Sequence, residues 1–255
     1  MHDSSPEPLT LRLLTLNIHK GFSVFNRRFI LPELREAIRA FSADVVCLQE
    51  VLGEHSGHQS RHPGWPLLSQ YEFLADSIWP QHAYGRNAVY TEGHHGNAVL
   101  SKYAVVSYRN YDISISGPEQ RGMLHCVLAL PGNRPPLHLI TVHLSLTEGH
   151  RQQQLARLCA VVAEQVPANA PLVVAGDFND WRGRAHAVLA REAGLEEVYL
   201  RSTGRAALSF PARWPLLRLD RIYVRQIASA APVLLTKRPW SHLSDHIPLG
   251  AELLL

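Results

Sequence analysis

The sequence PLVVAGDFNDW, at residues 171–181, places the strongest constraint on the fold of this chain. It begins with an apolar, β-branched run at residues 172–175, which is typical of a buried strand. The run ends at Gly176, and Asp177 and Asn179 follow it. Side chains alternate along a strand, so this carboxylate and amide project to the same side. The stretch predicts either a strand that delivers polar groups into a crevice or an ordinary Asx turn.

Length and composition are those of an ordinary globular protein. The 255 residues are 46% hydrophobic and 18% charged, enough for one large domain or two small ones. No apolar run is long enough to span a bilayer, and the polar start, MHDSSPEPLT, lacks the features of a secretory signal. We therefore expect a cytoplasmic protein without a transmembrane segment. The formal net charge of +3 permits a polyanionic partner but does not require one.

The three cysteines, Cys47, Cys126 and Cys159, each lie in an apolar run. Their number is odd, and their spacing is not that of a disulfide framework or a metal cluster. We expect them to be reduced and buried.

The order of the elements predicts a flexible tail at residues 1–9 and a single α/β domain at residues 10–255. Strands are expected within 88–130, notably at 96–101 and 123–130, and also at 11–16, 43–48, 137–144, 172–175, 221–224, 232–236 and 247–254. Helices are expected at 32–41, 71–79, 148–166 and 185–194, and a loop at 53–66. This pattern favours at least one large mixed or antiparallel sheet.

Polar residues recur where these apolar strands end. They are Asn17, Glu50, His143, Asp177, Asn179, Asp220, Asp245 and His246. Taken singly, each is explained as a turn residue or as a satisfied core histidine. Together, carboxylates and amides without cysteine suit a hard cation such as Mg²⁺ or Mn²⁺, and the added histidines suit hydrolysis of phosphate esters.

Seven motifs resemble those of the endonuclease/exonuclease/phosphatase superfamily, which has the DNase I-like fold. They are LNIHKG, CLQEV, GNAVLS, VHLSL, GDFND, LDRIYV and SDHIPL, and they run in the family's order from Asn17 to Pro248. The chain looks most similar to little-characterised bacterial members. The resemblance implies a four-layer sandwich, in which two mixed β-sheets lie face to face between outer helices, with an active-site cleft at one edge.

The same resemblance implies a role for each motif residue. Glu50 would be the principal Mg²⁺ ligand, with Asn17 beside it and Mn²⁺ as a substitute metal. Asp245 would complete the metal environment or lie just behind the direct ligands. Asp177 would activate the attacking water. Asn179 would hold the phosphate or order Asp177.

Further residues would contact the substrate. His246 would bind the phosphate, oriented and kept cationic by Asp220. His143 matches a histidine of the DNase I, sphingomyelinase and inositol-phosphatase branches, and would stabilise the phosphoryl group or protonate the leaving oxygen. We also assign Lys20, Asn97 and Arg121 as substrate contacts, although an arginine such as Arg121 is nearly as often a surface residue.

Three hypotheses remain for the function. The leading one is a phosphodiesterase acting on DNA or RNA, because Lys20, Arg27, Arg28, Arg182 and Arg184 lie in or near the motif loops. The second is a phospholipid or small-molecule phosphoesterase, for which residues 210–217 would be either a peripheral membrane contact or a buried segment. The third is a noncatalytic binding protein on the same fold. No obligate protein partner is expected.

Several residues have more than one interpretation. His94 and His95 are either substrate contacts or part of a solvated loop, and we favour the loop. Trp181, Trp214 and Trp240 lie in expected loops, where they would stack on bases, enter a membrane interface or pack at a rim.

Overall fold

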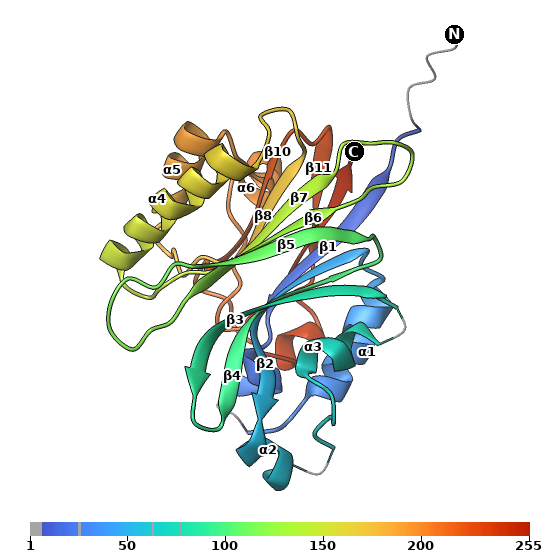
Figure 1. Cartoon of the computed structure of the whole chain (residues 1–255), viewed down its shortest axis with the longest axis vertical. Helices are drawn as coiled ribbons and strands as arrows, with labels where there is room; N and C mark the ends of the chain where they lie inside the picture. The colour runs from blue at the N-terminus through green and yellow to red at the C-terminus, as the bar shows by residue number, and fades with distance from the viewer. Residues whose placement is uncertain (1–6, 25–26, 63, 77) are drawn as a thin grey trace.

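Two six-stranded β-sheets lie face to face, with helices on their outer sides (Figure 1). This is seen in a computed structural model of the chain, which describes residues 7–24, 27–62, 64–76 and 78–255. The strand orders are β11-β12-β1-β2-β4-β3 and β5-β6-β7-β8-β10-β9. The predicted four-layer sandwich of two mixed sheets is therefore confirmed.

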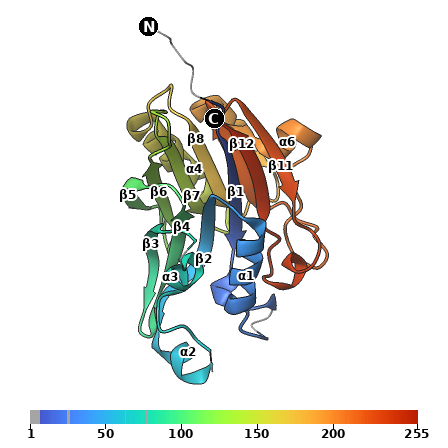
Figure 2. The ribbon, with the colours of Figure 1, turned by 90° about the vertical axis from the view of Figure 1, so that its right-hand side faces the viewer.

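The first sheet joins the two ends of the chain, since β1 pairs antiparallel with β12 (Figure 2). Its strands are β1 (Thr10–Asn17), β2 (Val45–His55), β3 (Gln81–Tyr90), β4 (Gly93–Ser101), β11 (Ser229–Leu234) and β12 (Leu249–Leu254). The second sheet contains β5 (Val105–Asp112), β6 (Gly122–Leu128), β7 (Leu137–His143), β8 (Leu172–Asp177), β9 (Glu196–Glu197) and β10 (Asp220–Arg225).

Helices cover both outer faces of the sandwich. The α-helices of the described residues are α1 (Leu31–Phe41), α2 (Ser56–Arg61), α3 (Gln70–Ala75), α4 (Glu148–Gln165), α5 (Arg184–Ala193) and α6 (Val198–Thr203). The apolar faces of α1 and α3 pack on the first sheet, and those of α4 and α5 pack on the second. Among the described residues, no helix is both long and apolar enough to cross a bilayer.

The central strands are buried on both faces. In β1, Leu11 and Leu13 join the core between the sheets, whereas Leu14 and Leu16 join the core under α1. Alternate side chains of a strand face opposite ways, so such a strand needs apolar residues at nearly every position. This explains why β2 and β8 each begin with four apolar residues, and why only Arg12 and Thr15 interrupt the leucines of β1.

Each sheet contains one parallel pair of strands near its centre, and these two pairs position the site. β1 and β2 are parallel, with Asn17 opposite Gln49, and β7 and β8 are parallel, with His143 opposite Asp177. All other pairings are antiparallel. The carboxyl ends of the two pairs therefore bring polar side chains from both sheets to one place.

Four local predictions were wrong. The expected loop at residues 53–66 instead holds the end of β2 and helix α2. His94 and His95 lie in β4 and not in a loop. The helix expected at 71–79 already ends at Ala75, because Asp76 has a φ of 46°. Cys159 is only half-buried, whereas Cys47 and Cys126 are buried, and all three are free thiols.

Most of the predicted tail at residues 1–9 lies outside the described residues. Leu9 is described, and its backbone exchanges two hydrogen bonds with Leu255, with N–O distances of 3.0 and 2.9 Å. The tail and the single domain therefore stay predictions, with Leu9 placed at the start of the paired chain.

Two buried histidines on neighbouring strands of the second sheet contact each other. His125 of β6 and His138 of β7 have Nε2 and Nδ1 3.0 Å apart, so one ring donates to the other. Burial and the neighbouring His138 lower the pKa of His125 to about 4. The folded protein thus holds this pair neutral, whereas an unfolded histidine takes a proton below its ordinary pKa of 6.5.

We predict that this pair makes the protein less stable in acid. The stability contribution of His125 is present above pH 6.5 and is lost as the pH falls toward 4, by about 1 kcal/mol at pH 5.5. Urea unfolding at pH 7.5 and 5.5 measures this, and the difference should shrink in His125→Gln. The exposed His82→Gln serves as the control. An equal pH dependence in all three proteins would contradict the prediction.

Candidate active site

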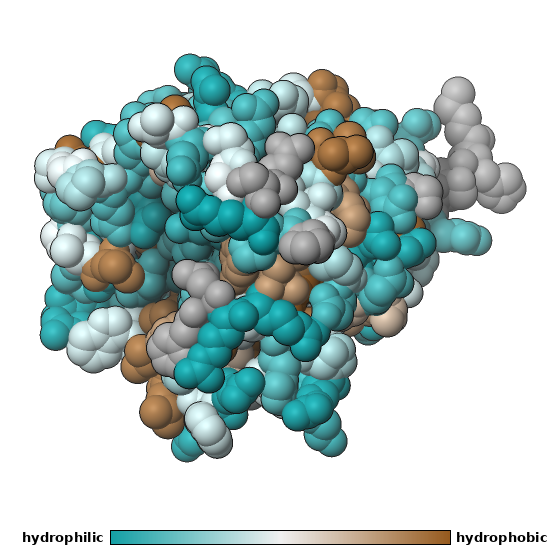
Figure 3. Space-filling view, turned by 90° about the horizontal axis from the view of Figure 1, so that it is seen from below, coloured by the Kyte–Doolittle hydropathy of each residue, from teal (hydrophilic) through white to brown (hydrophobic). Residues whose placement is uncertain are grey.

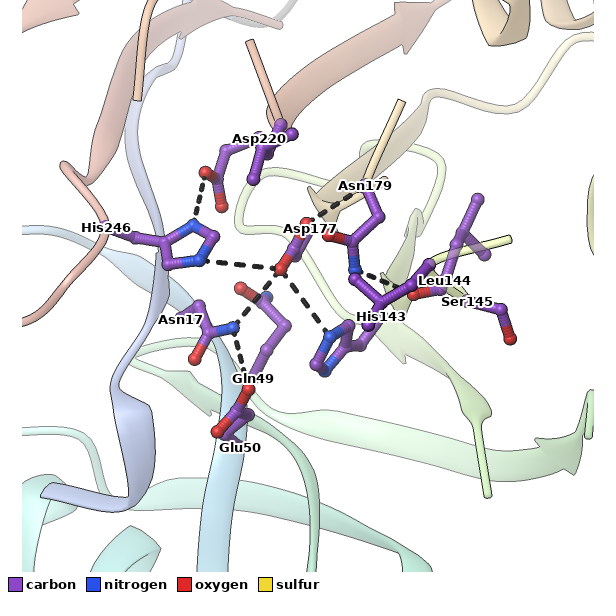
Figure 4. A network of polar contacts seen from close by, with 12 residues as sticks. Asn17, Gln49, Glu50, His143, Leu144, Ser145, Asp177, Asn179, Asp220 and His246 are labelled. Carbon is purple, nitrogen blue, oxygen red and sulfur yellow. Dashed lines mark hydrogen bonds and ion pairs between the residues drawn. The ribbon is translucent and has the colours of Figure 1, made fainter. Parts of the chain in front are cut away.

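Asp177 lies at the centre of the site, at the end of β8 and almost fully buried (Figure 4). Its Oδ2 lies 3.2 Å from Nδ2 of Asn17, 3.5 Å from Nε2 of His143 and 3.8 Å from Nε2 of His246. Its Oδ1 accepts a hydrogen bond from the backbone N–H of Asn179 at 2.9 Å. Burial raises the pKa of Asp177 to about 6, although the His246 cation opposes this rise.

Gly176 allows β8 to bring Asp177 close to β7. It has a φ of 144°, and a Cβ built on it would lie 2.1 Å from the backbone oxygen of Val142. Any other residue would therefore push the two strands apart at this point. The glycine therefore permits a close approach of the two strands.

Asn17 joins the two sheets at the site. From the end of β1, its Nδ2 donates to Asp177 and also to Oε1 of Glu50, both at 3.2 Å. Its Oδ1 accepts from the backbone N–H of His19 at 3.0 Å. The amide thus separates two carboxylates, which would otherwise repel each other.

His246 and Asp220 form a buried pair. Nδ1 of His246 lies 2.8 Å from Oδ2 of Asp220, the first residue of β10. Burial opposes the charge on this imidazole, but Asp220 and Asp177 outweigh it and raise the pKa of His246 to about 10. His246 is therefore a cation at neutral pH and directs its other nitrogen toward Asp177.

His143 differs from His246 in charge. It is buried at the end of β7, and burial, together with Arg121 and the His246 cation, holds its pKa well below the ordinary range. Near neutral pH it is a neutral imidazole that can donate one hydrogen bond.

The side-chain amide of Asn179 donates to the backbone oxygen of Leu144 at 2.9 Å. It is therefore the backbone N–H of Asn179, and not its side chain, that orders Asp177.

Glu50 lies inside β2 and not after it as we expected, because β2 continues through a bulge. The pairing with β4 slips between Leu48 and Val51, and Glu50 has a φ of 55°. Bulges of this kind re-aim side chains. Here the bulge allows Gln49 and Glu50 both to face the second sheet. Gln49 donates to Oγ1 of Thr141 at 3.0 Å, and Glu50 lines one cleft with His143 and Asp177.

Asp245 is held by His19, a residue to which we assigned no individual role from the sequence. Nδ1 of His19 lies 2.8 Å from Oδ2 of Asp245, and this contact raises the pKa of His19. His19, Lys20 and Gly21 have successive φ values of 46°, 56° and 82°, which fold the loop after β1 tightly. The position of His19 two residues after Asn17 was the available sequence signal.

A cleft of about 340 Å³ opens beside these residues. It is lined by Asn17, Glu50, Arg121, His143, Asp177, Asn179 and His246, with Leu146, Trp181, Phe210, Leu217 and Leu219 as its apolar part. Asp220 pairs with His246 of the cleft wall, and Asp245, the residue before His246, pairs with His19. Six of the eight predicted strand-end residues therefore line one cleft, and Asp220 and Asp245 lie next to it.

The three predicted substrate contacts differ in their positions. Arg121 lines the cleft and forms an ion pair with Glu119, with Nη2 and Oε1 2.7 Å apart. Lys20 is half-buried in the loop after β1. Asn97 is buried and donates its amide to the backbone oxygen of Gly122 at 2.9 Å, so it ties β4 to the second sheet. His95, which we had favoured as a loop residue, shares a small side pocket with Glu50 and Arg121.

The three tryptophans also differ. Trp181 and Trp214 are 51% and 75% exposed, whereas Trp240 is buried against Phe41 with ring centroids 6.4 Å apart. Only Trp181 and Trp214 are therefore available to a ligand.

The residues fit a divalent cation best around Glu50. In the part of the chain that the structure describes, Glu50 has no ion pair with a basic residue, and its hydrogen-bond partner is the Asn17 amide. Asp177, Asp220 and His246 also place ligand atoms within 4.8 Å of one another. A protonated imidazole has no lone pair for a metal, however, so the raised pKa of His246 disfavours that trio.

The fold and this arrangement of carboxylates, amides and histidines define a phosphoesterase class of site. A family model described as the endonuclease/exonuclease/phosphatase family matches residues 14–246. The chain belongs to this family, whose members hydrolyse phosphoester bonds and generally use a divalent metal. It is also 55% identical over 247 residues, 97% of each chain, to the Uncharacterized protein YbhP of Escherichia coli strain K12.

Solved structures show the same fold. The endonuclease/exonuclease/phosphatase of Beutenbergia cavernae matches with a TM-score of 0.76 and 20% identity, over 96% of this chain and 72% of that one. Danio rerio TDP2, complexed with a single strand DNA product, matches with 0.67 and 18%, over 96% and 98%. The mannosyl-6-phosphatase of Bacteroides thetaiotaomicron matches with 0.68 and 16%, over 96% and 100%. At these identities the likeness is one of fold.

We predict that Asp220→Asn lowers the pKa of His246 by about two pH units from its value of about 10, because a buried cation loses one of the three carboxylates that stabilise its charge. An NMR titration of the imidazole in EDTA measures this. Asp44→Asn, which removes a carboxylate paired with Lys102, is the matched control. An unchanged pKa in Asp220→Asn would show that Asp220 does not keep His246 charged.

Proposed function

We propose that this protein is a divalent-metal-dependent phosphodiesterase that acts by in-line attack of an activated water, with DNA or RNA as its substrate. The observation that carries the proposal is Asp177. A buried carboxylate whose pKa is raised to about 6 lies beside an imidazolium, at the edge of an open cleft. Perturbed groups facing each other in a cleft are typical of catalytic acids and bases.

Asp177 is suited to accept the proton of the attacking water. With a pKa near 6 it is largely ionised at neutral pH, yet it is a stronger base than an ordinary carboxylate. The Asn179 N–H and the Asn17 amide fix its two oxygens. The proton then moves onto Oδ2, the oxygen nearest to His143 and His246.

The two histidines are suited to the phosphoryl group. His246, kept cationic by Asp220, offers positive charge to the oxygens that become more negative as water attacks. Neutral His143 donates a hydrogen bond to the same group or to the leaving oxygen. Arg121 on the cleft wall is placed to hold a phosphate oxygen.

Glu50, with Asn17 and Asp245 beside it, would hold the metal, which we propose to be Mg²⁺ with Mn²⁺ as a substitute. The bound ion would polarise the phosphoryl oxygens as a Lewis acid. In the present arrangement Asn17 directs its amide nitrogen toward Glu50, so Glu50 is the stronger assignment of the two.

A second candidate is a phosphoesterase of phospholipids or small molecules. Leu146, Trp181 and Leu217 give the cleft an exposed apolar rim, and Leu216 beside it is 72% exposed. Such a rim suits a lipid surface as well as a base.

The noncatalytic alternative has less support, because it gives no role to the buried ion pair of Asp177 and His246. The three free thiols suit the cytoplasm that we propose as the compartment.

We predict that Asp177→Asn lowers kcat on phosphodiesters at least about 100-fold, because the variant lacks the general base. The assay is a panel of plasmid, single-stranded DNA, RNA, phospholipid vesicles and bis-p-nitrophenyl phosphate, with Mg²⁺, Mn²⁺ or EDTA. Asp112→Asn, at the end of β5, is the matched control. Activity that survives in Asp177→Asn would refute the assignment of the base, and a preference for vesicles would select the second candidate.

We further predict that Glu50→Gln weakens metal binding at least about tenfold, because it removes the carboxylate that has no basic partner. Mg²⁺ and Mn²⁺ should raise the melting temperature of the wild type by binding to its folded state, and higher concentrations should be needed in the variant. Glu54→Gln, an exposed carboxylate of the same strand, is the control. Identical metal titrations for Glu50→Gln and the wild type would move the metal away from Glu50.

A further inference from the structure

A second pocket, of about 550 Å³, lies beside the catalytic cleft. Its wall includes Ile30, Pro211 and Trp214 as apolar surface and Arg28, Arg213 and His242 as basic groups. None of the described residues that line it is acidic. This volume is in the range of sites for small ligands, and the charge suits an anion. Seen from below, the molecule carries brown, apolar areas within a largely teal, polar surface (Figure 3).

The pocket is joined to the cleft through the loop at residues 209–217. Phe210 lines the cleft, and the next residue, Pro211, lines the pocket. The base of the loop is closed by a hydrogen bond from Ser209 N to Leu217 O at 2.9 Å. Ala212 is buried and donates its N–H to the backbone oxygen of Asp245 at 2.7 Å. The loop is therefore fixed to the catalytic residues and presents Trp214 in a defined place.

Two neighbouring side chains of this loop, Arg213 and Trp214, are exposed to solvent. Trp214 is 75% exposed although a tryptophan contributes a large apolar area. Arg213 is exposed and forms no ion pair within the described ranges, whereas Arg28 pairs with Glu33 and Arg238 contacts His242. A free arginine next to an exposed indole is a surface for a ligand that has both an anionic group and a flat ring.

A similar pair lies at the cleft itself. Trp181 lines the cleft and is 51% exposed, and the guanidinium of Arg182 lies 4.5 Å from the centre of its ring. One tryptophan–arginine pair therefore lies at the catalytic opening and the other in the adjoining pocket. Proteins that bind single strands use this combination, in which aromatic rings stack on successive bases and basic groups follow the phosphates.

We infer that the pocket is a subsite for a nucleotide next to the scissile phosphate of a single-stranded nucleic acid. The base packs on Trp214 and its phosphate lies at Arg213. This inference rests on the proposed phosphodiesterase function and names its substrate class. A single strand is required because base faces in a duplex are already stacked on each other and are closed to Trp214. A lipid surface fits less well, since these basic groups line a concave wall and not a flat rim.

The test measures binding without turnover. A fluorescein-labelled oligothymidylate is titrated with the protein in EDTA, and its anisotropy is followed at several salt concentrations. We expect Trp214→Ala to raise Kd about tenfold through lost stacking. Arg213→Gln should raise it a few-fold and reduce the salt slope by about one. A duplex of the same length should bind more weakly than the single strand.

Matched controls and a second assay separate the outcomes. Tyr108→Ala and Arg201→Gln remove an exposed aromatic and an exposed arginine elsewhere, and should bind like the wild type. Equal Kd values of Trp214→Ala and the wild type for the oligonucleotide would overturn the inference. A variant Trp214→Ala that lost binding to phosphatidylglycerol vesicles, but bound the oligonucleotide as the wild type does, would overturn it as well. Hydrolysis of bis-p-nitrophenyl phosphate by the wild type with Mg²⁺ tests the proposed function separately. Its failure would refute the hydrolysis, while the Kd values would still decide the pocket.

Discussion

The burial of Asp177 is the constraint on which the rest of the site depends. A carboxylate out of contact with water must be protonated or compensated by donors and cations. Here the donors come from Asn17 at the end of β1 and from the backbone of Asn179, and the cation is His246. His246 is itself buried, and it stays charged because Asp220 holds its other nitrogen. The two sheets must therefore meet in one register before any of these charges is stable.

Two exceptions to regular strand geometry allow the two sheets to bring their polar side chains together. Without the bulge in β2, alternation would send Glu50 to the face opposite Gln49, away from the second sheet. The left-handed backbone of Glu50 costs about 1–2 kcal/mol, and pairing of β2 with β1 and β4 on both sides supports it. At Gly176 the exception is the missing side chain, which allows β8 to approach β7. Both exceptions thus lie where the first and second sheets deliver their carboxylates.

The sequence allowed most of the fold and the set of strand-end residues to be predicted, because both depend on local pattern. Strands buried on both faces are continuous apolar runs, and their polar ends are visible without a structure. What failed depends on distant contacts. The bulge at Glu50 and the extension of β2 to His55 come from pairing with β4, and the sequence around Glu50 contains no local signal that predicts them. His19 contacts Asp245 only because the fold brings the two residues together, and the hydrogen bond from Asn97 to Gly122 depends on distant segments in the same way.

The chemistry and the choice of substrate are built from different parts of the molecule. Strand ends hold Asp177, His143 and Asp220, and the backbone of Asp177 is paired with both of the others, which fixes the three side chains relative to one another. The surfaces that surround them lie on loops, of which residues 209–217 are the clearest case. A loop can change its side chains without disturbing the pairing of the strands, so the same catalytic set can serve different esters. The exposed Trp214 and unpaired Arg213 are therefore better guides to the substrate than any buried residue of the site.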